Sequence, residues 1–156
     1  TAGVPPCGLR LYAERNRNMM ISTKGRYALR LMIDLAMHEQ DGFVSLKDIS
    51  ERQGISVKYL EQIMALLNKE NLLSSQRGPQ GGYRLAKKPE EYSVGEILRA
   101  VEGSLAPIAC LEGEENPCPR QKECMTIGFW EGLNRVIDEY IDSVTLQDLL
   151  KDSSAF

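Results

Sequence analysis

Residues 45–85 read SLKDISERQGISVKYLEQIMALLNKENLLSSQRGPQGGYRL, and this stretch decides the fold. Ser45 and Asp48 match the capping-box pattern that begins a short helix. Gly54 ends that helix in a tight turn, where glycine adopts a positive φ without steric cost. Ser56 then caps a longer helix with one apolar face. The stretch therefore predicts two helices joined by a short turn.

A glycine-rich hairpin follows these two helices. Short strands are predicted over 72–75 and 83–85, and QRGPQGG joins them. The glycines and the proline favour a tight turn over a buried element. The predicted fold class is therefore mainly α with a small β-hairpin wing. It is a winged helix-turn-helix followed by a long C-terminal helix.

Two further helices flank this stretch. Ser22 and Thr23 predict the N-terminus of a first helix, which carries apolar residues at helical spacing and runs to about His38. Ser93 predicts the start of a fourth helix, and Gly103 predicts its end. Each of these boundaries rests on a residue type that is favoured at helix ends.

The charge of the chain is unevenly distributed. The net charge is −3, which by itself argues against a nucleic-acid partner. Residues 19–102, however, carry 12 Lys and Arg against 11 Asp and Glu, whereas 103–156 carry 4 against 10. The acidic excess therefore lies after the helix-turn-helix, which leaves room for a local basic patch. No apolar run reaches the length of a membrane span, so no membrane partner is expected.

The second helix of the pair, over 56–70, has the polar face of a recognition helix. Glu61 suits a hydrogen bond from cytosine N4, and Gln62 suits adenine. Arg77 at the hairpin tip suits the minor groove. The alternatives are a solvated surface or a protein-interaction module that does not contact DNA. The predicted DNA-binding residues from this region are Lys58, Tyr59, Glu61, Gln62, Arg77 and Gly78.

Three cysteines fall within fifteen residues: Cys110, Cys118 and Cys124. They lie in a polar loop over 104–124, where a structural buried cysteine is not expected. No signal peptide is visible, so a disulfide framework is disfavoured. Thiolates at this spacing suit an iron–sulfur cluster or a zinc ion. A metal-free switch, in which two cysteines pair on oxidation, is the alternative.

A long helix is predicted from about Met125. Its apolar residues step by threes and fours in a near-heptad pattern. Because the preceding winged domain already has a core, this helix is predicted to form a dimer seam. The predicted interface residues are Trp130, Leu133, Ile137, Tyr140, Ile141 and Val144.

The motifs TKGRYAL, ISERQGIS, YLEQ and RGPQGGY, taken together, resemble the Rrf2-type winged helix-turn-helix repressors over about residues 19–150. The resemblance implies a cytoplasmic homodimer on a palindromic promoter site, with Glu61, Gln62 and Arg77 reading bases. It also implies that the start of the first helix approaches the phosphate backbone. The matching positions there are Ser22, Thr23, Lys24, Arg26 and Tyr27.

The iron–sulfur members of this family carry three cysteines in the corresponding loop, so the resemblance favours a 2Fe–2S cluster. The gap of seven residues between Cys110 and Cys118 is slightly longer than in those members, and two positions also depart from the pattern. Ile127 stands where a histidine completes the cluster, and Arg26 stands where nitric-oxide-sensing relatives use an aspartate. The fourth ligand is therefore open. The candidates are a water, a small thiol, or a glutamate of the loop: Glu112, Glu114, Glu115 or Glu123.

These observations divide the chain into four parts. Residues 1–18, which include Cys7, are expected to be a leader or a vector-derived segment. The winged domain is predicted over 19–103, the sensor loop over 104–124, and the dimerisation helix with a final short helix over 125–156. No catalytic dyad, phosphate loop or acid pair is present in the sequence, so an enzyme is not expected.

Overall fold

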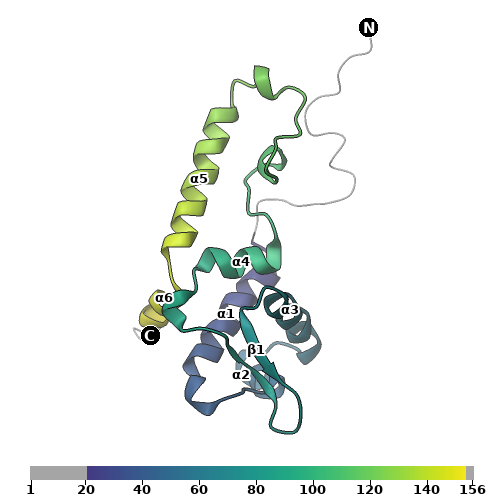
Figure 1. Ribbon diagram of the computed structural model, residues 1–156, viewed down its shortest axis with the longest axis vertical. Coiled ribbons are helices and arrows are strands. Elements are labelled where there is room, and N and C mark those ends of the chain that lie inside the picture. The colour runs from purple at the N-terminus through teal and green to yellow at the C-terminus, as the bar shows by residue number, and fades with distance from the viewer. Residues whose placement is uncertain (1–20, 154–156) are drawn as a thin grey trace. The chain divides into compact units, whose positions relative to one another are not determined.

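The computed structural model describes residues 21–153, so the predicted leader with Cys7 lies outside the described residues. Within this range the chain forms two compact units (Figure 1). One unit comprises 21–103 together with 140–153, and we call it the winged unit. The other comprises 104–139, and we call it the cysteine unit. Each is described by itself.

The first three helices of the chain belong to the winged unit. They are α1 (Thr23–Met37), α2 (Leu46–Gln53) and α3 (Val57–Lys69), and a short 3-10 turn, η1 (Glu39–Asp41), follows α1. The side chains of the N-cap residues Ser22, Ser45 and Ser56 each accept a hydrogen bond from a backbone N–H in the first turn. These bonds satisfy donors that have no partner within the helix, so the predicted starts are confirmed.

The turn between α2 and α3 depends on Gly54. Its backbone lies in the left-handed region at φ 65°, and its N–H donates to Ser50 O. A residue with a Cβ is disfavoured in that conformation, which is the reason for glycine at this position.

The wing is a two-stranded antiparallel hairpin of β1 (Leu73–Gln76) and β2 (Gly82–Leu85). Leu73 lies opposite Leu85, and Gln76 lies opposite Gly82. A bridge between Val44 and Tyr83 joins the hairpin to the segment before α2. A Cβ at Gly82 would collide with the Val44 carbonyl, so this close approach requires glycine. The wing is thereby attached directly to the helix-turn-helix.

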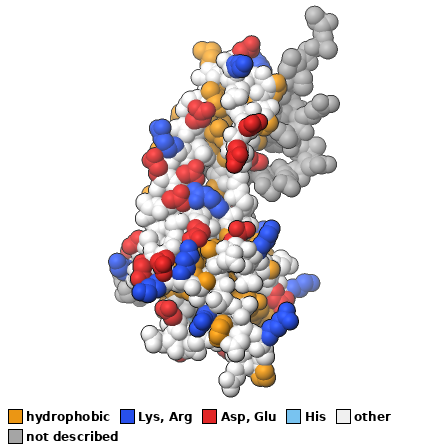
Figure 2. All heavy atoms as spheres, in the orientation of Figure 1, with side chains coloured by type: hydrophobic (Ala, Val, Ile, Leu, Met, Phe, Trp, Pro, Cys, Tyr) orange, Lys and Arg blue, Asp and Glu red, His pale blue; other side chains and the backbone are white. Residues whose placement is uncertain are grey.

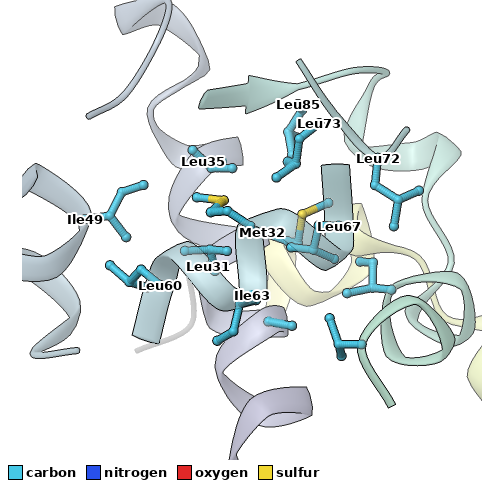
Figure 3. Close-up of a cluster of buried hydrophobic side chains, with 14 of the residues drawn as sticks. Leu31, Met32, Leu35, Ile49, Leu60, Ile63, Leu67, Leu72, Leu73 and Leu85 are labelled. Atoms are coloured by element: carbon cyan, nitrogen blue, oxygen red, sulfur yellow. The ribbon is translucent and has the colours of Figure 1, made fainter. Parts of the chain in front are cut away.

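The core of the winged unit lies between α1, α3 and the hairpin (Figure 3). Leu31, Leu60 and Ile63 are completely buried, and Leu73 and Leu85 close the hairpin side of the cluster. The apolar residues recur three and four positions apart along α1 and α3, so each helix turns one face inward. The opposite face of α3 is left open to solvent.

The winged unit contains four further elements after the hairpin. It contains η2 (Pro89–Glu91), α4 (Val94–Glu102), the last turn of α5 (Ile127–Ser143) and α6 (Leu146–Ser153). Tyr92 is buried, and its hydroxyl donates to Leu72 O at 2.7 Å while accepting from the N–H groups of Ala86 and Lys87. Burial raises the pKa of this hydroxyl, although the two backbone hydrogen bonds oppose the effect.

The cysteine unit has no comparable core. It contains two short 3-10 turns, η3 (Ala109–Leu111) and η4 (Gln121–Glu123), and the greater part of α5. None of residues 104–139 is buried. The predicted fold class, with its hairpin wing and long C-terminal helix, is confirmed. Across the described residues, no helix combines the length and apolar character needed to cross a membrane.

Candidate nucleic-acid interface and cysteine segment

The open face of α3 carries the predicted base readers. Lys58, Glu61 and Gln62 are all exposed. Tyr59 is different, because it is partly buried and packs against the core. Its ring meets that of Tyr27 edge to face, with centroids 5.8 Å apart. The structure therefore presents three of the predicted α3 residues to solvent and uses the ring of the fourth to hold α3 against α1.

Tyr27 also links α1 to the helix-turn-helix turn. The Arg30 guanidinium lies 5.2 Å from the centroid of the Tyr27 ring. Arg30 Nη2 donates to Gln53 O at 2.8 Å, and Nε donates to Gln53 Oε1 at 3.2 Å. Gln53 is the last residue of α2, so these contacts satisfy a carbonyl at a helix C-terminus. They position the turn relative to α1.

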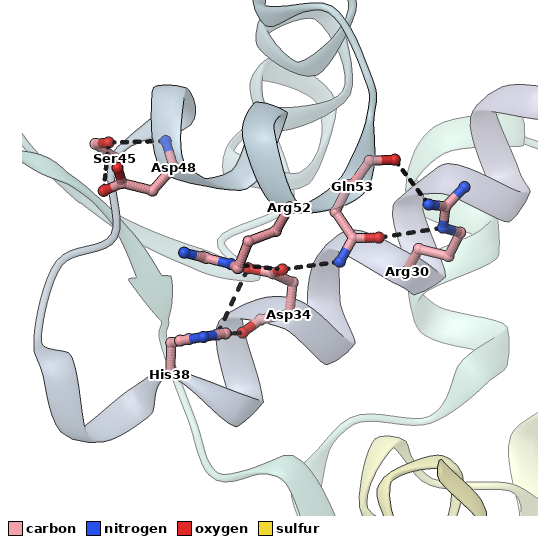
Figure 4. A network of polar contacts seen from close by, with 7 residues as sticks. All are labelled: Arg30, Asp34, His38, Ser45, Asp48, Arg52 and Gln53. Carbon is pink, nitrogen blue, oxygen red and sulfur yellow. Dashed lines mark hydrogen bonds and ion pairs between the residues drawn. The ribbon is translucent and has the colours of Figure 1, made fainter. Parts of the chain in front are cut away.

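A buried carboxylate joins the same elements (Figure 4). Asp34 of α1 is 3% exposed. Arg52 donates to both of its carboxylate oxygens, at 2.6 and 3.1 Å, and Gln53 Nε2 donates at 2.8 Å. Burial would raise the pKa of Asp34, but the hydrogen bonds from Arg52 and Gln53 outweigh it and hold the pKa below its usual value. The carboxylate is therefore charged and fixes α2 on α1.

This network was missed in the sequence reasoning. One sequence feature could have predicted it. Asp34 lies between Leu31 and Leu35 on the apolar face of α1, and a buried carboxylate requires a cationic partner. His38 belongs to the same corner. Its Nδ1 lies 2.8 Å from Asp34 O, and its ring is partly exposed.

The predicted phosphate-approaching residues lie at the N-terminus of α1, and a carboxylate from α4 engages this end of the helix. Glu102 Oε1 accepts from Ser22 N at 2.9 Å, from Ser22 Oγ at 2.6 Å and from Gly25 N at 3.0 Å. Thr23 Oγ1 accepts from Arg26 Nη2 at 3.0 Å, and Lys24 Nζ donates to Val101 O. Sequence reasoning did not find Glu102, because it lies 80 residues from Ser22.

The wing tip carries Arg77 and Gly78, which are both exposed. Gly78 has φ 111°, which a side chain disfavours. At the base of the wing, the Arg84 guanidinium lies 4.7 Å from the centroid of the Phe43 ring. On the face shown in Figure 2, acidic and basic side chains are interspersed over the winged unit without a field of one sign.

The three cysteines of the cysteine unit are partly exposed and form no disulfide. Cys110 lies in η3, Cys118 N donates to Asn116 Oδ1, and Cys124 ends η4. A hydrogen bond with the Thr126 hydroxyl, 3.5 Å away, lowers the pKa of the Cys124 thiol. Within residues 21–153, no three His, Cys, Asp or Glu side chains gather closely enough to hold a metal. Ile127, at the position expected for a histidine ligand, is the first residue of α5.

Helix α5 exposes a broad apolar face. Tyr140 is 69% exposed, and the other predicted seam residues are partly exposed. Phe129 and Val136, which were not predicted, are 66% and 58% exposed. They lie four positions before and three positions after Leu133, so they widen the stripe. An apolar face of this kind is typical of a surface that another chain covers.

Exposed polar side chains on a capped helix, beside a narrow glycine-rich loop, place the protein in the class of winged helix-turn-helix DNA-binding regulators. The comparisons with known proteins give the family. Residues 21–152 match the Rrf2 family, described as an iron-dependent transcriptional regulator, and the chain belongs to this family.

Three relatives define the similarity. The chain is 44% identical over 135 residues to the HTH-type transcriptional regulator IscR of Aliivibrio salmonicida (strain LFI1238), covering 86% of this chain and 79% of the relative. The solved structure of T. potens IscR matches with a TM-score of 0.68 and 44% identity over 86% of this chain and 88% of that one. CymR, the global cysteine regulator of B. subtilis, matches with a TM-score of 0.68 and 39% identity, over 85% and 96%. These relatives are regulators, and the protein is not an enzyme.

Proposed function

We propose that the protein is a homodimeric regulator whose affinity for a palindromic promoter site is set by an iron–sulfur cluster bound at Cys110, Cys118 and Cys124. The observation that carries the DNA-binding part is the open polar face of α3 beside the exposed Arg77, in a chain of the Rrf2 family. The setting is the cytoplasm, where promoter DNA and reduced thiols occur together.

The proposed DNA contacts follow from exposure and position. Lys58, Glu61 and Gln62 enter the major groove, and Arg77 with Gly78 enters the adjacent minor groove. The α1 start, over 22–27, approaches a phosphate, and Lys24 and Arg26 supply positive charge that offsets the Glu102 carboxylate at the same helix end. Tyr27 and Tyr59 contribute through the ring contact that sets the angle between α1 and α3.

The homodimer is supported by the apolar face of α5. None of its seventeen residues is buried within this chain, although the helix carries Trp130, Leu133 and Ile137. Covering that face with a second copy removes apolar surface from water. A two-fold dimer also presents two recognition helices about 34 Å apart, one turn of DNA, which matches a palindromic site. Residues 125–144 are therefore assigned to dimerisation.

The donor set of the cysteine unit fits an iron–sulfur cluster in its chemistry. Its three cysteines are free of disulfides, and the Thr126 hydroxyl favours the thiolate form of Cys124, which is the form that ligates. The described conformation does not gather three ligands, so ligation requires residues 104–124 to rearrange. None of these residues is buried, and a rearrangement therefore does not disrupt a packed core. When bound, a cluster supplies reversible oxidation and sensitivity to iron supply.

A carboxylate of the same segment, a water or a small thiol supplies the fourth ligand, because Ile127 has no donor atom. Glu112, Glu114, Glu115 and Glu123 are all exposed. His38 belongs to the winged unit, and its Nδ1 already lies against the Asp34 carbonyl. Gathering the cysteines would order the segment directly before α5 and alter the spacing of the two recognition helices. A coupling of about 1.4 kcal/mol would change operator affinity tenfold.

Anaerobic reconstitution with iron and sulfide tests the cluster. The expected result is a coloured protein with visible charge-transfer absorbance and about two irons and two sulfides per chain for a 2Fe–2S cluster. Cys110→Ser, Cys118→Ser and Cys124→Ser each lose this absorbance, whereas Cys7→Ser, the matched control outside the segment, retains it. A colourless protein that retains only zinc contradicts the cluster and supports the zinc alternative.

A metal-free thiol switch is the second candidate, and the lowered pKa of Cys124 favours it, since the thiolate is the nucleophile in disulfide formation. Peroxide treatment of the metal-free protein would then remove two hydrogen atoms from the mass, and a reductant would restore them. A Cys124→Ser variant that shows the same mass change rules out Cys124 as a partner in that disulfide.

Binding to promoter fragments in a salt series tests the DNA contact. Arg77→Ala is expected to weaken binding by about 1–3 kcal/mol per half-site, because one base-edge contact is lost in each. Lys88→Ala, an exposed cation outside the proposed interface, is the control and leaves binding unchanged. Equal binding by the wild type and Arg77→Ala shows that Arg77 does not contribute to DNA binding, whereas the absence of binding by either protein argues for a protein-interaction module.

A further inference from the structure

The open face of α3 carries one large apolar residue that the proposed contacts do not include. Val57 is the first residue of α3, and it is 39% exposed. The other exposed large hydrophobic residues of the winged unit are Ile21, Met37 and Tyr140, which lie on or beside other helices. Val57 is thus the exposed large hydrophobic residue of the recognition helix.

Local helix formation does not explain a valine at this position. Its branched Cβ lowers helix propensity, and a polar residue is usual on a solvated face. The N-cap bond from Tyr59 N to Ser56 Oγ already begins the helix without any contribution from Val57. The exposed part of the side chain is available for a contact made outside this chain.

The position of Val57 on the helix is that of a base reader. The N-terminal residues of a recognition helix contact base edges in the major groove. Glu61 and Ala65 follow at steps of four residues, so the three side chains lie in one stripe, and all three are exposed. Tyr59, the other bulky residue of this turn, packs on Tyr27 and leaves the stripe open.

The spacing also fits the geometry of DNA. Four residues of α-helix rise about 6 Å, and base pairs are about 3.4 Å apart. Val57 and Glu61 therefore address bases one or two pairs apart in the same half-site. The apolar group that a pyrimidine presents in the major groove is the C5-methyl of thymine.

We propose that Val57 is a specificity-determining residue that packs against the C5-methyl group of a pyrimidine, thymine in unmodified DNA, beside the base pair read by Glu61. The proposal rests on the proposed DNA-binding function. It adds a methyl contact to an interface otherwise made of charged and amide groups. The operator thus contains a thymine whose methyl group contributes to affinity once in each half-site.

The experiment starts with selection of binding sites from randomised duplexes by the wild-type homodimer. Each symmetric pair of thymines in the selected site is then replaced by uracil, which removes only the methyl group. One such replacement is expected to weaken wild-type binding about tenfold, since a methyl-sized apolar contact is lost twice. The same replacement changes binding by Val57→Ala less than twofold.

Further measurements distinguish the contribution of the methyl group to binding from that of the rest of the base. Replacing that thymine–adenine pair by 5-methylcytosine–guanine keeps the methyl group, and the wild type should bind this duplex more tightly than its unmethylated counterpart. Val57→Ile keeps an apolar branched side chain and should retain the discrimination against uracil. Met37→Ala, an exposed apolar residue outside the interface, is the control and should behave as the wild type.

An equal uracil penalty in the wild type and in Val57→Ala overturns the role of Val57 and leaves DNA binding intact. Selection of an identical site with equal affinity by Val57→Ala does the same. A wild-type protein that selects no sequence overturns the proposed DNA-binding function and the Val57 proposal together. Circular dichroism compares the helix content of each variant with that of the wild type. If Val57→Ala is unfolded, the comparison of the wild type with Val57→Ile tests the proposal.

Discussion

The winged unit and the cysteine unit differ in the contacts that stabilise them. In the winged unit, a buried cluster centred on Leu31, Leu60 and Ile63 packs the helices, and the Asp34 carboxylate joins α1 to α2. In the cysteine unit, no residue between 104 and 139 is buried. The same chain thus contains a domain stabilised by its own core and a segment whose apolar side chains are all at least partly exposed.

This difference separates two roles. A packed core allows few alternative arrangements, so the winged unit presents a fixed surface. A segment without a core changes conformation at low cost, and a bound group or a second chain then determines its structure. The cysteine unit therefore suits the proposed sensor role, and the winged unit suits the proposed DNA contact.

The largest expected effect concerns the core. Leu60→Ala should lower the free energy of unfolding by about 2–5 kcal/mol, because it leaves a cavity beside α1. Val136→Ala, in the cysteine unit, should lower it by about 0.5 kcal/mol or less and should act instead on self-association. Urea unfolding followed by circular dichroism, with sedimentation to measure dimerisation, checks both. An equal loss of unfolding free energy in the two variants would contradict the difference between the two units.

The next effect concerns the buried carboxylate. Asp34→Asn should cost about 2–3 kcal/mol, since it removes the charge partner of Arg52 within a buried hydrogen-bond network. The matched control is Asp142→Asn, which affects an exposed ion pair with Arg99 in the same unit and should cost about 1 kcal/mol or less. Chemical unfolding at neutral pH measures both changes. A smaller loss for Asp34→Asn than for the control would contradict a structural role for the network.

The same residue predicts a pH dependence. The folded-state pKa of Asp34 is lowered, so its stabilisation is complete above the unfolded pKa of about 3.9 and is lost as the pH falls through the folded value. Unfolding titrations between pH 6 and pH 2 (a range of about four units) should show a slope of up to about 1.4 kcal/mol per unit from this group. Asp34→Asn should reduce that slope, and an unchanged slope would assign it to other carboxylates.

The smallest effect compares two helix glycines. Gly25→Ala should destabilise the winged unit by about 1 kcal/mol, because a Cβ collides with the Glu102 carboxylate and displaces it from its three hydrogen bonds. Gly132→Ala in α5 has no atom within 4 Å of the new Cβ and should stabilise that helix by about 0.5–1 kcal/mol. Thermal unfolding measures both. Destabilisation by Gly132→Ala would instead indicate that a second chain covers this position.

The sequence by itself determined the local events. The starts of α1, α2, α3 and α4 follow from serine caps that bond to N–H groups two or three residues away. Gly54 ends α2 because its own backbone conformation favours glycine. Short-range bonds of this kind depend on neighbouring residues alone, so the winged helix-turn-helix and the exposure of Glu61, Gln62 and Arg77 could be predicted.

Only the tertiary structure decided the contacts between distant residues. Asp34 meets Arg52 across 18 positions, and Ser22 meets Glu102 across 80. The edge-to-face packing of Tyr59 on Tyr27 likewise joins residues of two different helices. The exposure of Val57 also depends on the tertiary structure, because the packing of α3 on the core determines which of its residues are buried. Such contacts depend on how whole helices pack, and the order of residues along one helix does not contain that information.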